Sequence, residues 1–185
     1  MPQCRQKSRA GVAYVLAMLY LMLFTVLAVG FCAGSAMSMQ IARNDRSIAD
    51  AQAAAESGMA FVRHELGHVT IPNDVSQANL AKTLADSLAQ ELDGSANLNG
   101  HSLKSTGNVI ALPGENEWTT LDSETGTRFC AQLTFTGRTV VVKVTGRGRD
   151  DSISRAIQME FKQSARGEGQ THFVAETATY AEVSP

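Results

Sequence analysis

The first part of this 185-residue sequence lacks proline and charge, and each absence has a structural meaning. No proline lies between Pro2 and Pro72, so nothing in this stretch stops an α-helix outright. No charged residue lies in residues 10–42, although about 20 apolar residues already suffice to cross a bilayer. The sequence therefore predicts a transmembrane helix that continues, without a break, beyond the membrane.

The charges that precede this apolar run are all basic: Arg5, Lys7 and Arg9. The positive-inside bias places such a leader in the cytoplasm and the rest of the chain outside. A cleaved secretory signal is the alternative, because Gly34-Ser35-Ala36 offers small residues for cleavage. The apolar run is about twice the usual 7–15 residues of a signal core, which favours a retained single-pass anchor.

Cysteine pairs and nucleic-acid motifs are also missing. The three cysteines, Cys4, Cys32 and Cys130, fall in the leader, the apolar run and the outer part, which excludes a disulfide framework. The net charge of −2, with no basic stripe and no aromatic RNA-binding motif, excludes nucleic acid as an expected partner. No serine–histidine–aspartate order and no phosphate-binding glycine loop is present.

Residues 44–69 are rich in alanine and carry apolar residues at helical spacing, which predicts an amphipathic continuation of the same helix from about Gly11 to Val69. The expected buried stripe consists of Ile48, Ala55, Met59, Val62, Leu66 and Val69. A second helix is expected after Pro72, with a row of leucines at 80, 84, 88 and 92 and an N-cap at Asn73, Asp74 or Ser76.

Beyond residue 126 the apolar period changes from helical to two, which predicts antiparallel strands at about 127–137, 139–148 and 153–162. A short strand is expected at 108–112, a last strand at 171–180, and Trp118 is expected as a core anchor. One face of this sheet is apolar and needs a cover, which the stripe of the long helix provides.

The predicted fold class is therefore α+β, with a long N-terminal helix packed on a small antiparallel sheet. Its expected parts are a basic leader (1–9), a transmembrane helix (10–42), its amphipathic continuation (43–71), a second helix (72–94), an antiparallel β head domain (95–163) and a polar C-terminal tail (164–185).

The motif His64-Glu65-Leu66-Gly67-His68 has the H-E-x-x-H pattern of zinc hydrolases. On a helical wheel, however, His64 and His68 lie opposite the apolar stripe, whereas a catalytic zinc needs ligands turned into a cleft and a third ligand. The sequence distance of Glu91 from the motif suits a glutamate as third ligand, but Glu91 lies near the end of an amphipathic helix, where an acidic residue is common. We expect no catalytic residue, metal or cofactor. A zinc metalloprotease with His64, His68 and Glu65 is the alternative hypothesis.

The stretch SRAGVAYVLAMLYLMLFTVLAVG, followed by ARNDRSIADAQAAAESGMAFVRHEL, resembles the N-terminal domain of PilX-type pilus-assembly proteins over roughly residues 5–66. Arg9, Gly11, Ala53, Ala54, Ala55, Glu56 and Gly58 carry the match. The outline of a long helix under a small sheet is similar to type IV pilins and type II secretion pseudopilins. The resemblance implies a non-enzymatic minor pilin or pseudopilin, stored in the inner membrane with its C-terminal domain in the periplasm.

The resemblance also implies partners and site residues. The partners are membrane lipid, other pilins or pseudopilins, and a prepilin peptidase acting at Gly11 and Val12, and an extracellular pilus is the second location. Assembly would use one set of helix residues: Leu16, Leu19, Leu23, Val26, Gly30, Ala55, Glu56 and Gly58. Major pilins carry a glutamate fifth after the processed glycine, where this chain has Leu16, which suits a filament tip. A third hypothesis is an anchored adhesion or binding domain without a filament role.

Overall fold

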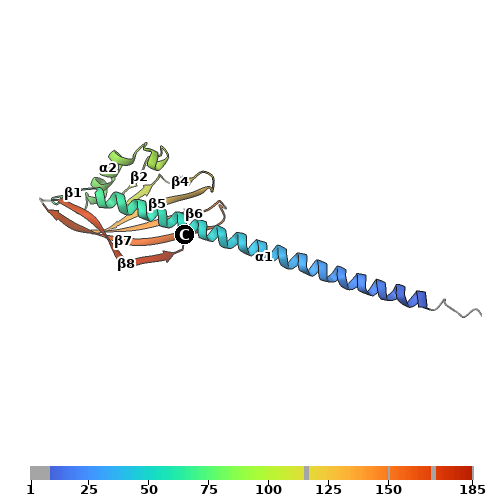
Figure 1. Ribbon diagram of the computed structural model, residues 1–185. Coiled ribbons are helices and arrows are strands. Elements are labelled where there is room, and N and C mark those ends of the chain that lie inside the picture. Colours follow the sequence, from blue (N-terminus) through green and yellow to red (C-terminus); the bar gives the residue numbers. More distant parts are fainter. Residues whose placement is uncertain (1–8, 115–116, 150, 168–169, 185) are drawn as a thin grey trace, which may run out of the picture. The chain divides into compact units, whose positions relative to one another are not determined.

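A computed structural model describes residues 9–114, 117–149, 151–167 and 170–184 (Figure 1). The chain divides into two compact units, one up to Asp45 and one from Arg46 to Pro185. Helix α1, Arg9–His68, begins in the first unit and ends in the second. The basic leader 1–8, with Cys4, lies outside the described residues.

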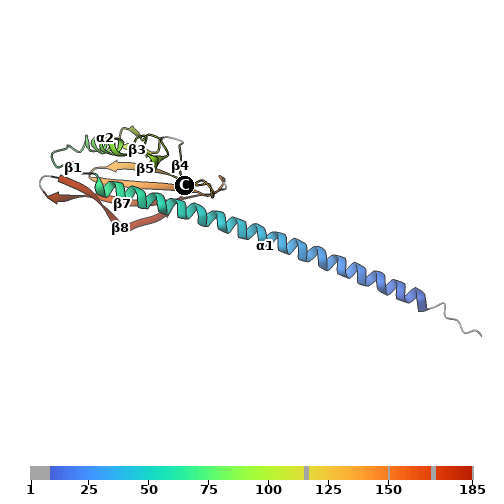
Figure 2. The same ribbon diagram turned by 45° about the horizontal axis from the view of Figure 1, so that its top comes forward.

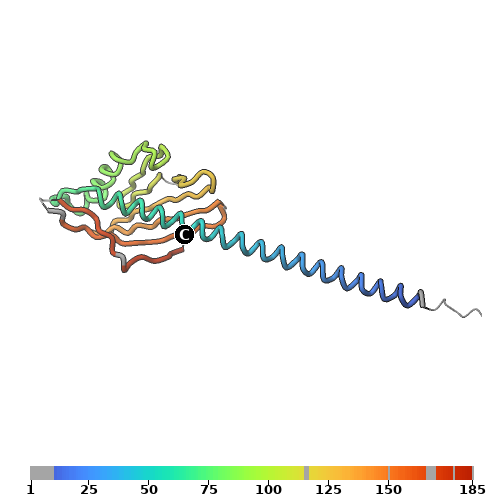
Figure 3. The backbone as a smooth tube through the Cα atoms, in the orientation of Figure 1, coloured from blue at the N-terminus to red at the C-terminus, as the bar shows by residue number. Residues whose placement is uncertain are grey.

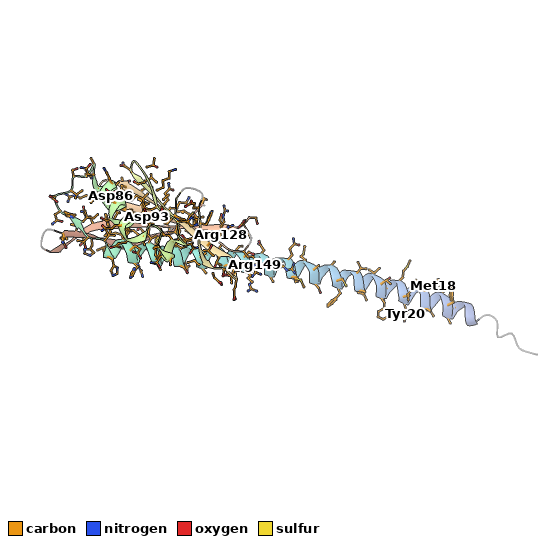
Figure 4. All side chains as sticks on the ribbon, turned by 90° about the horizontal axis from the view of Figure 1, so that it is seen from above. Met18, Tyr20, Asp86, Asp93, Arg128 and Arg149 are labelled. Atoms are coloured by element: carbon orange, nitrogen blue, oxygen red, sulfur yellow. The ribbon has the colours of Figure 1, made fainter. Side chains whose placement is uncertain are left out.

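In the first unit, α1 carries apolar side chains around its whole circumference. Figure 4 shows Met18 and Tyr20 pointing away from the helix on different sides, and both are more than half exposed. The helix is long and apolar enough to cross a membrane by length and composition, with a mean hydropathy of 2.5 in its most apolar window. This property is the one that the uncharged run predicts.

The second unit is an eight-stranded antiparallel sheet with two helices on one face (Figures 1 and 2). Its strand order is β1-β8-β7-β6-β5-β3-β2, and β4 pairs with β5. The bounds are β1 Ile71–Pro72, β2 Lys104–Thr106, β3 Val109–Leu112, β4 Thr119–Asp122, β5 Thr127–Thr136, β6 Thr139–Arg147, β7 Ser154–Gly167 and β8 Gln170–Val183. The tube in Figure 3 shows β5 to β8 following one another as a meander.

The core lies between the inner face of the sheet and the helices, as the period-two pattern predicts. The inner face consists of buried side chains from β5, β6 and β7: Phe129, Ala131, Leu133, Phe135, Val140, Val142, Val144, Ile157, Met159 and Phe161. From α1 the cover is the expected stripe from Ala55 to Val69, in which Val62 and Leu66 are at most 2% exposed, whereas the expected Ile48 is only half-buried. Helix α2, Leu80–Leu92, adds its leucine row to the same cluster. The α+β fold class is therefore confirmed.

Small residues let α1 approach β6 very closely. A Cβ atom built on Gly146 would lie 2.3 Å from the carbonyl oxygen of Ala51 and 2.3 Å from the amide nitrogen of Ala55. A Cβ atom on Gly58 of the helix would lie 2.5 Å from the ring of Phe129. The alanine- and glycine-rich stretch of the helix is therefore where the backbone of α1 lies on the sheet.

The second helix starts later than the sequence indicates. It begins at Leu80 after Asn79, so the expected N-caps at Asn73, Asp74 and Ser76 are wrong. The reason lies in β1, because Ile71 and Pro72 are paired with β8 and hold the chain extended. The helix then begins at the first leucine of the row, a residue that is 2% exposed.

The sheet is larger than the three or four strands that the periodicity predicts. The last strand expected at 171–180 is confirmed and is longer than predicted, since β8 occupies Gln170–Val183. Because β7 also continues to Gly167, most of the expected polar tail belongs to the sheet. Between residues 95 and 126, the strand expected at 108–112 is confirmed as β3, and β2, β4 and the short helix η1, Ala96–Leu98, are additional. Polar residues dominate β2, β4 and β8 because these strands form the periphery of the sheet, where few side chains are buried.

Candidate functional site

The histidines of the H-E-x-x-H motif lie on the exposed side of α1. The side chain of His64 is 65% exposed, and its ring centroid is 4.2 Å from that of His68. His68 Nδ1 lies 2.9 Å from the backbone oxygen of His64, one helical turn earlier. Leu66, between them in sequence, points the other way and is completely buried. The motif thus combines one core residue with a stacked, solvent-facing pair of imidazoles.

The described side chains near this histidine pair do not form a set of metal ligands. Glu65 Oε1 lies 3.4 Å from His64 Nδ1, and the Glu65 side chain is 13% exposed beside the leucines of α2. Glu91 is exposed on α2. Among the residues that the structure describes, no group of three or more histidine, cysteine, aspartate or glutamate side chains could hold a metal ion. A hydrolytic zinc needs three protein ligands and an open position in a cleft.

We expect that the purified full chain, in detergent, does not bind zinc tightly at one ion per chain. Two exposed imidazoles without a third ligand give weak coordination that competes poorly with a chelator. Zinc content after dialysis and hydrolysis of a casein substrate measure this, with Glu65→Gln as the matched variant. Retained stoichiometric zinc together with peptidase activity that Glu65→Gln abolishes would establish the metalloprotease alternative instead.

The residues expected to mediate assembly separate into two groups. Leu16, Leu19, Leu23 and Val26 are 48 to 69% exposed in the first unit, and Gly30 has no atom within 4 Å of an added Cβ. The processing candidates Gly11 and Val12 lie near the start of α1, and Val12 is 61% exposed. These positions are accessible, as an assembly surface or a peptidase requires.

The second group lies in the other unit, and two of its three members face the sheet of the same chain. Ala55 is completely buried and Gly58 packs against Phe129. Glu56 is exposed, and its Oε1 accepts a hydrogen bond of 3.1 Å from Gln52 Nε2. The structure therefore gives Ala55 and Gly58 a place in intramolecular packing, whereas Glu56 stays on the surface.

Trp118 is not the core anchor that the sequence predicts. It is half-buried on the outer face of the sheet, the face away from α1, with the guanidinium carbon of Arg147 4.4 Å from its ring centroid and that of Arg128 5.6 Å away. The sequence holds a signal for this arrangement. Arg128 and Arg147 take the outward positions of their strands, and they are cross-strand partners in the β5–β6 register.

Comparison with known proteins finds similarity to a protein family in the first part of the chain. Residues 10–60 match the family model described as PilX N-terminal, a family of pilus-assembly proteins. No curated protein and no solved structure matches the chain. The match contains the whole uncharged run and the alanine-rich segment that packs on the sheet. Residues 10–60 are therefore similar to the PilX N-terminal family, and the resemblance to PilX-type pilus-assembly proteins is confirmed over this part of the chain.

Proposed function

We propose that the protein is a non-enzymatic structural subunit of a pilus or of a type II secretion pseudopilus, and that it assembles through the first part of α1. The main support is the exposed apolar surface of the first unit. Large side chains from Val12 to Ile41 are each 48 to 77% exposed, and they surround the helix. A helix that is apolar on all sides needs lipid or other helices around it.

Before assembly, this helix is the inner-membrane anchor. Its length and composition suffice for one span, and the basic leader favours a cytoplasmic N-terminus with the second unit in the periplasm. The proposed division is leader 1–9, span 10–42 and an extracytoplasmic remainder. Gly11 and Val12 are the proposed processing site of a prepilin peptidase. In the assembled state the lipid is replaced by the helices of other pilins.

The position of this subunit in the filament is proposed to be the tip. The run 10–42 has no acidic residue, and Leu16 occupies the place where a major pilin pairs a carboxylate with a neighbour's amino terminus. A tip subunit has no neighbour above it and needs no such pair. The expected direct contacts are therefore with different pilins below it rather than with copies of itself.

Crosslinking through Cys32 tests this proposal. Cys32 is exposed on α1 within the apolar run. In a Cys4→Ser, Cys130→Ser chain, a bismaleimide should join Cys32 to helices of other pilins in the sheared filament fraction. Mass spectrometry of the adduct identifies the partner. We expect a heterologous adduct, which requires that a partner pilin carry or be given a cysteine at a facing helix position.

The control is the same chain with Cys32→Ser, which must give no adduct. Adducts between two copies of this chain would contradict the tip position and support a place along the filament. If the chain is absent from the filament fraction and no pilin is captured at any facing position, the assembly function itself is wrong.

A further inference from the structure

The outer face of the sheet carries a groove that the pilus function does not use. It has a volume of about 590 Å³ and lies on the side of β5 and β6 away from the two helices. Its walls come from β3, β5 and β6 and from the segment before β4: Ala111, Pro113, Gly114, Glu117, Trp118, Cys130, Ala131, Gln132, Lys143, Thr145 and Arg147. This volume falls within the range of about 300–1,000 Å³ that is usual for small-ligand sites.

The described side chains that line the groove carry a net positive charge. Lys143 and Arg147 line it, and Glu117 is the one acidic residue among the lining side chains of the described chain. Glu117 has a partner, since its Oε2 lies 3.3 Å from His101 Nδ1. Burial raises the pKa of the Cys130 thiol, and Arg147 and Lys143 act against that effect on the same pKa. The positive charges of Arg147 and Lys143 are therefore close enough to Cys130 to affect a group inside the groove.

Arg147 is held in place by stacking, and among the described residues it forms no ion pair. Its guanidinium lies over the ring of Trp118, a contact that uses the face of the guanidinium and leaves its N–H groups at the edge. Arg128 in contrast has an ion pair with Asp151. The Nε atom of Arg147 is buried and has no hydrogen-bond acceptor among the described residues. A buried donor of this kind is available to an acceptor on a bound ligand.

Lys143 complements Arg147 from four residues earlier on the same outward face of β6. Its Nζ donates a hydrogen bond of 2.8 Å to the backbone oxygen of Ser184, which holds the side chain in one direction. An ammonium group has three protons, so two stay available to a ligand. Between the cations and on β5 lie the neutral hydrogen-bonding groups of Thr145 and Gln132.

We propose that this groove binds an acidic saccharide, with the sugar carboxylate held by Arg147 and Lys143 and the sugar ring beside Trp118. A carboxylate accepts two parallel hydrogen bonds from an oriented guanidinium. Amide and hydroxyl groups such as those of Gln132 and Thr145 match sugar hydroxyls, and an aromatic face matches the C–H side of the ring. A protein partner fits less well, because a protein interface buries about 800 Å² per partner, far more than one compact groove provides. This inference does not rest on the filament function.

The single tryptophan of the chain makes the groove directly observable. Trp118 lines it, so its fluorescence reports binding without a label. The full chain in detergent is titrated with three probes: trigalacturonate, its trimethyl ester and a triglutamate peptide. We expect a saturable change with trigalacturonate at concentrations below about 10 mM, and a response at least about tenfold weaker with the uncharged ester.

Variants then assign the effect to the groove. Arg147→Gln and Lys143→Gln are each expected to weaken trigalacturonate binding at least about tenfold, because each removes a charge-assisted hydrogen bond. Arg155→Gln is the matched control, since Arg155 is an equally cationic strand residue that pairs with Glu182 outside the groove. It should bind as the unchanged chain does. Thermal unfolding followed by circular dichroism verifies that all three variants are folded.

Several outcomes would overturn the inference. One is the absence of any fluorescence change with trigalacturonate in this range. Another is equal binding of trigalacturonate by Arg147→Gln, Lys143→Gln and Arg155→Gln, which would indicate non-specific charge attraction. Binding of triglutamate as tight as that of trigalacturonate would assign the groove to acidic polypeptides rather than saccharides.

Discussion

Gly146→Ala is expected to destabilise the second unit severely, by about 3 kcal/mol or more. The added methyl group would lie 2.3 Å from two backbone atoms of α1, a distance that real Cβ atoms essentially never show. Backbone atoms in the middle of a packed helix cannot rotate away as a side chain can. The helix would have to move off β6, and the contacts of Val62 and Leu66 with the sheet would loosen with it.

Urea unfolding of the full chain in detergent, followed by Trp118 fluorescence, measures how much Gly146→Ala lowers the free energy of unfolding. Gly67→Ala is the matched control, because Gly67 lies in α1 with no atom within 4 Å of an added Cβ. That change should be neutral or stabilise by up to about 1 kcal/mol, since alanine favours a helix more than glycine does. Equal midpoints for the two variants would show that the helix does not lie this close to the sheet.

Leu66→Ala is expected to cost about 2–5 kcal/mol, whereas His64→Ala and His68→Ala should stay within about 0.5 kcal/mol of the unchanged chain. Leu66 is completely buried, and around it lie apolar side chains of α1, α2, β3 and β5: Phe61, Val62, Leu88, Leu92, Leu112 and Leu133. The two histidines are on the exposed side of the same turn and make no core contact.

The same urea titration compares the three variants, once with a chelator and once with added zinc. This comparison distinguishes two roles of the H-E-x-x-H motif, namely core packing through Leu66 and metal binding through the two histidines. If zinc raises the unfolding midpoint of the unchanged chain and His64→Ala abolishes that gain, the histidines bind metal in the folded protein. If the histidine variants lower the free energy of unfolding as much as Leu66→Ala does, the face of α1 that carries the histidines is buried in the folded protein.

The central part of the fold follows from the sequence because its patterns are strong. The proline-free and charge-free run predicts α1, and strict alternation along 129–135 and 140–144 predicts which side chains of β5 and β6 are buried. Both are local consequences of helix and strand periodicity. The exposed position of His64 and His68 follows from the same geometry, which is why the motif could be interpreted without a structure.

The full extent of the peripheral strands does not follow from the sequence, because their side chains carry little burial signal. In β8 only Thr171 and Phe173 are buried among the described side chains, so the sequence predicts a shorter strand at 171–180 within a polar tail. Its place in the sheet depends on backbone hydrogen bonds to β7. The position of Trp118 is also non-local, since its contacts with Arg128 and Arg147 exist only once β5 and β6 have paired.

The family match extends past the apolar run to residue 60 and includes Ala51, Ala54, Ala55 and Gly58. In this structure those four residues are buried against the strands of their own chain. Substitutions that introduce bulky side chains in this segment would therefore lower the amount of folded protein in the cell, independently of any step in assembly. If cells with such a substitution lack pili, the cause would be a low amount of this protein. An immunoblot of the protein distinguishes this cause from a defect in polymerisation.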